Sequence, residues 1–111
     1  NNLQNIVTNG IDANATKGLI TITDNLVDAA GTRNNGGTGI NIVGGENIVI
    51  GGTDDRNVIG DFTTGINIAG ALDVLIDNNE VTDGDNGIVV SNVTTELDIH
   101  NNDLTNGQNP D

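Results

Sequence analysis

The sequence contains no cysteine, methionine, tryptophan or tyrosine, and Phe62 is its only aromatic residue. Without cysteine the chain cannot be stabilised by disulfides, but this absence does not assign a compartment. No run approaches the ~18 consecutive apolar residues of a membrane-spanning helix, so membrane insertion is not predicted. The interior of the fold must therefore be built from Ile, Val, Leu and Ala.

Basic residues are also scarce, because three Lys and Arg stand against sixteen Asp and Glu, giving a net charge of −13. Binding to a nucleic-acid backbone needs a basic surface, so we predict no nucleic-acid partner. An anionic membrane surface is disfavoured for the same reason. Such a charge suits cation binding or a salty extracellular medium.

The length of 111 residues fits one domain, residues 1–111. The chain begins with Asn1 rather than Met and shows no signal peptide at its start. From this we predict a processed or excised product.

The most regular feature is a repeated Gly-Ile-x-Ile/Val motif, found at Gly39–Ile42, Gly65–Ile68 and Gly87–Val90. An apolar pair follows each copy at a nearly fixed distance, and an Asn-x-apolar step comes after the pair. With Gly10 and Gly107 included, successive motifs start 29, 26, 22 and 20 residues apart. A period in the twenties is typical of a solenoid, with the surplus residues placed in corners.

Apolar residues within the repeats alternate with polar or small ones, which predicts strands with one inward face. We therefore predict an all-β fold, a right-handed parallel β-helix of about four coils of 20–29 residues with three short strands per coil and no caps. The predicted inward residues are Ile11, Ile20, Ile22, Val27, Ile40, Ile42, Ile48, Ile50, Ile59, Ile66, Ile68, Val74, Ile76, Val81, Ile88, Val90, Leu97, Ile99 and Leu104. Val49 with Leu75, and Leu26 with Val58, are expected as neighbours on outer faces, where they could support lateral packing.

The repeats resemble the right-handed parallel β-helix of the pectate-lyase-like superfamily. In addition, the segment from Ile50 to Ile59 is similar to repeats in large secreted bacterial surface proteins of that fold. This resemblance implies an extracellular or cell-surface location. It leaves the activity open, because the superfamily includes lyases, hydrolases, epimerases, adhesins and inert stalks.

Asparagine recurs at one position of the coil, which predicts a ladder of stacked side-chain amides. Each amide is expected to donate to the next one, with the asparagine backbone in the left-handed conformation of a sharp corner. The predicted members are Asn5, Asn25, Asn57, Asn79 and Asn102. We interpret the ladder as structural, with ligand binding as the alternative.

Acidic corners offer oxygen ligands of the kind that calcium takes. The candidates are Asp54 and Asp55 in one corner and Asp83 and Asp85 in another. Neither corner matches an EF-hand loop or a Gly-rich nonapeptide calcium repeat. Calcium is thus a possible cofactor, and solvated acidic turns are the alternative.

An enzyme of this fold would need charged residues gathered on one outer face. Arg56 beside Asp54 and Asp55 is one candidate group, and Arg33 is another, but a surface salt bridge is the ordinary explanation for either arginine. His100 is expected on the outside without a nucleophile, and Phe62 is the one residue that could stack on a sugar. We predict no enzymatic activity.

No segment at either end is long enough to form a cap over the coils, which leaves two interpretations. Either the chain is cut from a longer solenoid, or its ends pair head to tail with other copies and form an open filament. The function predicted is that of an extracellular structural solenoid, a filament or stalk subunit. The alternative is a module that binds or cleaves a polysaccharide.

Overall fold

The computed structural model of the chain describes residues 2–4, 9–15, 17–29, 37–82 and 84–105. These residues form strands and turns with no helix, and hence no helix long and apolar enough to cross a membrane. The strands belong to three parallel sheets, and consecutive strands of the chain lie in different sheets. The predicted parallel β-helix with three strands per coil is confirmed.

We name the sheets A, B and C. Sheet A contains β1 (Asn2–Gln4), β4 (Leu26–Asp28), β7 (Val58–Gly60), β10 (Glu80–Thr82) and β13 (Asp103–Thr105). Sheet B contains β2 (Ile11–Ala15), β5 (Thr38–Gly44), β8 (Thr64–Ala69) and β11 (Asn86–Ser91). Sheet C contains β3 (Leu19–Ile22), β6 (Asn47–Gly51), β9 (Asp73–Asp77) and β12 (Glu96–His100).

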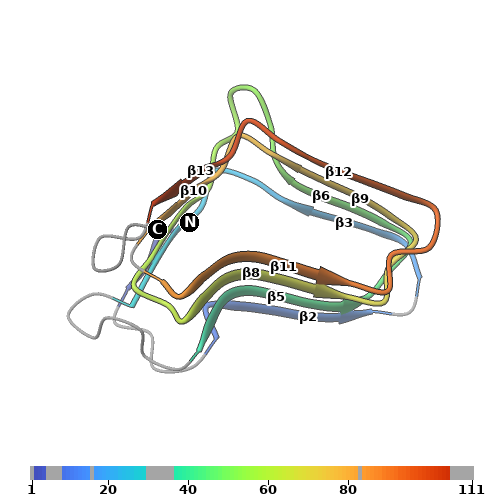
Figure 1. Cartoon of the computed structure of the whole chain (residues 1–111), viewed down its shortest axis with the longest axis horizontal. Helices are drawn as coiled ribbons and strands as arrows, with labels where there is room; N and C mark the ends of the chain where they lie inside the picture. Colours follow the sequence, from blue (N-terminus) through green and yellow to red (C-terminus); the bar gives the residue numbers. More distant parts are fainter. Residues whose placement is uncertain (1, 5–8, 16, 30–36, 83, 106–111) are drawn as a thin grey trace.

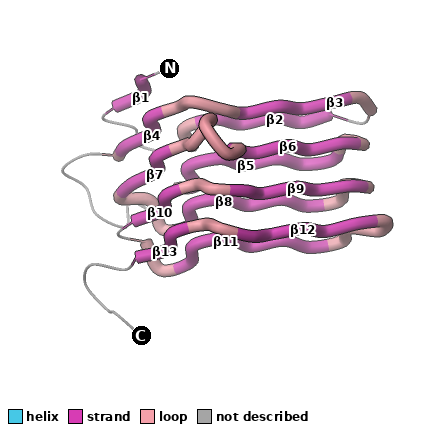
Figure 2. The backbone as a smooth tube through the Cα atoms, turned by 90° about the horizontal axis from the view of Figure 1, so that it is seen from above, coloured by secondary structure: helices cyan, strands magenta, loops and turns pink. Residues whose placement is uncertain are grey.

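The three sheets enclose a roughly triangular cross-section, with sheets B and C as the long sides and sheet A as the short one (Figure 1). The path from β2 through β3 to β4 runs anticlockwise in this view while later coils lie nearer the viewer, so the solenoid is right-handed. Seen from the side, the coils lie one below another, from β2, β3 and β4 to β11, β12 and β13 (Figure 2). The four strands of sheets B and C agree with the predicted coil number.

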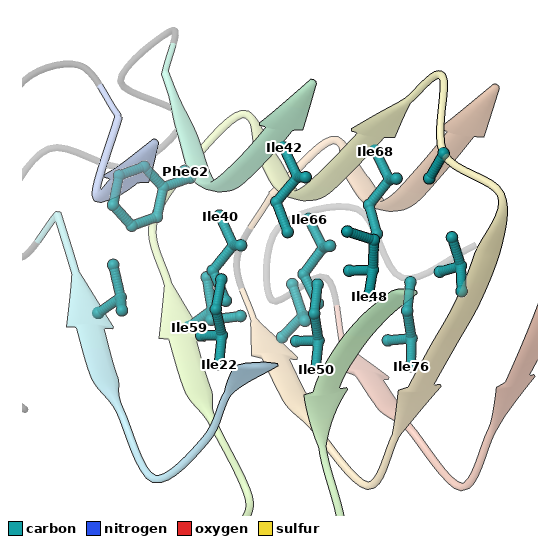
Figure 3. Packing of buried hydrophobic residues seen from close by; sticks show 14 of the residues in the cluster. Ile22, Ile40, Ile42, Ile48, Ile50, Ile59, Phe62, Ile66, Ile68 and Ile76 are labelled. Carbon is teal, nitrogen blue, oxygen red and sulfur yellow. The ribbon is translucent and has the colours of Figure 1, made fainter. Parts of the chain in front are cut away.

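Equivalent residues of the repeats are register partners, which explains why the motif recurs. Ile40 pairs with Ile11 and Ile66, and Ile66 pairs with Ile88. Period two sends these side chains to the interior of every coil. Their stacked isoleucines fill the space between the sheets (Figure 3).

Burial of the predicted core is complete in the middle coils and incomplete in the last one. Ile40, Ile59 and Ile76, for example, are fully buried. Leu97, Ile99 and Leu104 were predicted inward but are 47%, 42% and 51% exposed. These three belong to the last described coil, and no described strand covers its outer side.

Phe62 is 1% exposed and packs in the core cluster, so its ring is not accessible for stacking on a sugar. It follows β7 at the corner toward sheet B, where its ring lies within the coil (Figure 3).

The glycines that begin the motif allow sheets A and B to approach each other closely. A Cβ atom at Gly39 would collide with the Ile59 side chain and lie 2.7 Å from the Gly65 carbonyl oxygen. Gly65 has the same relation to Val81 and Gly87. The recurrence of Gly directly before Ile in each repeat therefore follows from close packing across a corner.

Two outer-face pairs lie where they were predicted. Val49 is the register partner of Leu75 in sheet C, and Leu26 is the partner of Val58 in sheet A. All four side chains are half-buried, and each pair bridges adjacent coils.

Candidate functional site

The asparagine ladder runs along the corner between sheets C and A. The Nδ2 atom of Asn25 donates to Oδ1 of Asn57 at 3.0 Å, Asn57 donates to Asn79 at 2.8 Å, and Asn79 donates to Asn102 at 3.0 Å. Four of the five predicted members are thus brought together in the predicted direction, and Asn5 lies outside the described residues.

Three of the ladder amides also donate backward to a carbonyl near the end of the sheet C strand one coil earlier. Asn57 donates to Ile22 O at 2.8 Å, Asn79 to Ile50 O at 3.0 Å, and Asn102 to Ile76 O at 2.9 Å. Asn57 and Asn79 are fully buried. Their amides therefore satisfy backbone groups that no water reaches, which is a structural role.

The predicted backbone conformation of the ladder residues is wrong. The left-handed residue comes just before Asn25, Asn79 and Asn102, at Asp24 (φ 55°), Asn78 (φ 58°) and Asn101 (φ 55°), whereas Arg56 before Asn57 is not left-handed. A two-residue corner needs one left-handed residue to turn the chain, and the residue after it then points its side chain into the coil. Asp and Asn tolerate this conformation better than other non-glycine residues do.

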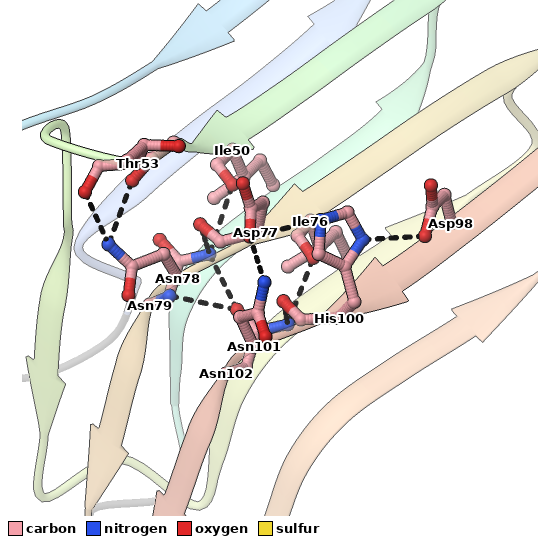
Figure 4. A network of polar contacts seen from close by, with 11 residues as sticks. Ile50, Thr53, Ile76, Asp77, Asn78, Asn79, Asp98, His100, Asn101 and Asn102 are labelled. Carbon is pink, nitrogen blue, oxygen red and sulfur yellow. Dashed lines mark hydrogen bonds and ion pairs between the residues drawn. The ribbon is translucent and has the colours of Figure 1, made fainter.

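The six-residue insertion before Asn57 is held against the next coil. Nδ2 of Asn78 donates to Gly52 O and to Thr53 O, both at 2.9 Å (Figure 4). Arg56 is the last residue of this insertion, and its Nη2 atom lies 2.9 Å from Oε2 of Glu80 in the next coil. The surface salt bridge interpretation of Arg56 is confirmed, while Arg33 lies outside the described residues.

The calcium candidates are separated by the fold. Asp54 and Asp55 are exposed in the insertion between β6 and β7, whereas Asp85 is exposed at the corner that leads into β11, and Asp83 lies outside the described residues. Across the described part of the chain, no group of three or more His, Cys, Asp or Glu side chains could hold a metal ion. Calcium stays a prediction for either corner alone.

The outer face of sheet C gathers acidic residues around His100. Its Nδ1 atom lies 2.7 Å from Oδ1 of Asp98, and its Nε2 atom lies 3.2 Å from Oδ1 of Asp77 (Figure 4). Asp77 is the register partner of His100 on β9, so the imidazole links the last two described coils. Beside this cluster a shallow groove of about 390 Å³ is lined by Asp73, Glu96, Asp98, Val49 and Leu75, among others.

These two carboxylates change the titration of the imidazole. The hydrogen bond to Asp98 raises the pKa of His100 above its usual 6.5, and the charges of Asp77 and Asp98 raise it further, while desolvation opposes them. His100 was predicted to be a lone outward histidine. Its side chain is outward and 44% exposed, but it contacts both Asp77 and Asp98. The sequence signal for this cluster was the Asp98-x-His100 spacing, which puts both residues on one strand face, together with Asp77 one coil earlier.

We expect the single histidine to titrate with a midpoint above pH 6.5 in an NMR titration. Asp98→Asn should lower this midpoint more than Asp77→Asn does, because the hydrogen bond to Asp98 is the larger cause. Since the folded pKa is raised, the stabilisation from the imidazolium is present below pH 6.5 and is lost as the pH rises through the folded value. Asp12→Asn on sheet B is the matched control, and a wild-type midpoint at or below 6.5 would contradict the cluster.

A second polar ladder lies on the outer face of sheet B. Nδ2 of Asn67 donates to Oδ1 of Asn41 at 2.9 Å, and Asn41 donates to Oδ1 of Asp12 at 3.0 Å. The alternation of apolar and polar residues in the Gly-Ile motif predicts Asn41 and Asn67 on the outside but does not by itself link them. The signal was present, because each residue stands two positions after a motif glycine.

The chain matches no protein-family model, no curated protein and no solved structure. The superfamily named by its resemblance therefore stays a prediction, whereas the parallel solenoid rests on the sheet topology.

Proposed function

We propose that the chain is a structural β-solenoid of an extracellular stalk or filament, joined end to end with other copies through its coil faces. The observation that carries this proposal is the last described coil. Its strands β11, β12 and β13 keep the register of the coils before them, with Ile88 on Ile66, Leu97 on Val74 and Leu104 on Val81. Ile88 is partly buried against the core, whereas the inward side chains of Leu97, Ile99 and Leu104 are exposed.

Such a coil presents three parallel strand edges around an apolar centre, which is the surface that another coil buries. Exposed strand edges pair readily with further strands. A head-to-tail contact of this kind is heterologous, so it continues into an open fibre. The net charge of −13 suits a salty extracellular medium.

We expect the purified chain to form linear assemblies as its concentration rises, measured by sedimentation velocity and electron microscopy. Leu97→Asp should weaken assembly by about tenfold or more, because it places a charge at the joining face. Leu72→Asp is the control, because Leu72 is 44% exposed, close to the 47% of Leu97, but lies at a corner before β9. A chain that stays monomeric at high concentration would overturn the proposal, as would an equal effect of the two variants.

The second candidate function is a polysaccharide-binding or polysaccharide-cleaving module. The groove over sheet C favours it, because Asp73 and Glu96 line the groove as register partners on adjacent strands. Glycoside hydrolysis uses such a pair of carboxylates. Cleavage of a polysaccharide by the chain, lost in Glu96→Gln, would favour this candidate over a purely mechanical one.

A further inference from the structure

The two ends of the described solenoid differ in shape. At the C-terminal end, β11, β12 and β13 complete one coil, so the three sheets end together. At the N-terminal end, β1 adds a fifth strand to sheet A above β4, whereas β2 and β3 are the first described strands of sheets B and C (Figure 2). Sheet A therefore stands one strand higher than its neighbours.

This step prevents a continuous joint as long as β1 stays in place. If β13 of one copy paired with β1 of the next, β11 and β2 would lie two strand spacings apart, about 9.6 Å, and so would β12 and β3. Backbone hydrogen bonds cannot span that distance. All three sheets become continuous only if β13 pairs directly with β4 of the next copy.

β13 has the side chains to replace β1 on β4. Leu3 is the register partner of Val27, and Leu104 holds the equivalent position in β13. The three strands between them have β-branched residues there, namely Val27, Ile59 and Val81. Leu3 is partly buried against the core, while Leu104 is 51% exposed.

The charges at the two faces also permit this joint. With β13 on β4, the register would place Asp103 on Leu26, Glu96 on Leu19 and Asp98 on Thr21, following the pairing of β3 and β4 with their neighbours. Like charges directly opposite each other would destabilise the joint, and this register places none opposite each other. The inward residues would stack Leu97 on Ile20, and Asn102 would lie beside Asn25, so the ladder would continue.

We propose that β1 occupies the docking edge of sheet A and that two copies join by strand exchange, in which β13 of one copy replaces β1 on β4 of the next. β1 contributes only three register pairs, so its release costs little compared with joining three sheets. This inference rests on the proposed end-to-end assembly and adds that β1 opposes it.

A reversible crosslink tests the exchange. The chain has no cysteine of its own, and residues 2 and 26 are register partners, close enough for a disulfide between neighbouring strands. We would compare Asn2→Cys/Leu26→Cys, oxidised and reduced, by sedimentation velocity. The control is Leu26→Cys/Val58→Cys, which crosslinks β4 to β7, two strands that stay paired throughout.

We expect the oxidised Asn2→Cys/Leu26→Cys chain to need at least about tenfold higher concentration to assemble than the reduced chain. Oxidation of the control pair should leave assembly unchanged. If the oxidised and reduced chains assemble equally, strand exchange is overturned while end-to-end assembly stands. If neither chain assembles, both proposals are overturned.

Discussion

Asn79→Ala is expected to lower the free energy of unfolding by about 3 kcal/mol or more, because each buried polar group left without a partner costs about 1–3 kcal/mol. Asn79 is fully buried and accepts from Asn57 at 2.8 Å. It also donates to Ile50 O at 3.0 Å and to Oδ1 of Asn102 at 3.0 Å. Alanine leaves these groups unpaired where water cannot replace the amide. Urea denaturation of wild type and variant measures the difference.

Asn67→Ala is the matched control, since it removes the same side chain from the outer ladder of sheet B. Asn67 is half-buried and donates to Asn41 at 2.9 Å, so water can replace the lost hydrogen bond. Its cost should stay near the roughly 0.5 kcal/mol typical of surface substitutions. Equal costs for Asn67→Ala and Asn79→Ala would show that the buried ladder does not hold the coils together.

Gly65→Ala is expected to destabilise the fold by about 1–3 kcal/mol, the usual cost of adding a methyl group to a packed core. The new Cβ atom would collide with Cγ1 of Val81 and would lie 2.7 Å from the Gly87 carbonyl oxygen. Gly65 and Val81 are buried, and the carbonyl belongs to the backbone, so neither neighbour can move away cheaply. Thermal and urea denaturation both report this change.

Gly87→Ala provides the control within the same column of glycines. Its added Cβ atom would meet only the side chain of Leu104, at 3.1 Å, and that side chain is 51% exposed and can rotate away. We therefore expect a change within about 0.5 kcal/mol. If Gly87→Ala destabilised the fold as much as Gly65→Ala does, this packing explanation would be contradicted. Both variants should be measured at low protein concentration, where copies do not join.

The same contrast between middle and last coils separates stability from assembly. The ladder and the glycine column stabilise the middle coils, where Asn57, Asn79 and Gly65 are buried. The exposed Leu97 and Leu104 contribute little to the folded monomer and, in our proposal, much to the joint between copies. Variants of the two groups should therefore change different measurements, the free energy of unfolding in one case and the concentration of assembly in the other.

The local sequence pattern was sufficient to predict the repeat, but it did not predict the backbone conformation of the corners. The Gly-Ile motif and its spacing predicted which isoleucines stack, and the register partners Ile40 and Ile66 agree. The left-handed residue was placed one position late, on Asn79 instead of Asn78. Both are asparagines, and only the direction in which the chain leaves β9 decides which of them turns and which points inward.

The sequence by itself determined the coil, the identity of the stacked residues and the ladder, because a period of two within strands and a period in the twenties between them are properties of the chain alone. Only the tertiary structure decided that Phe62 is buried, that Arg56 contacts Glu80 and that Asp77 joins His100. Each of these contacts depends on which side chains meet at a corner or across adjacent coils. Corner lengths vary between the coils, so sequence separation does not determine those distances.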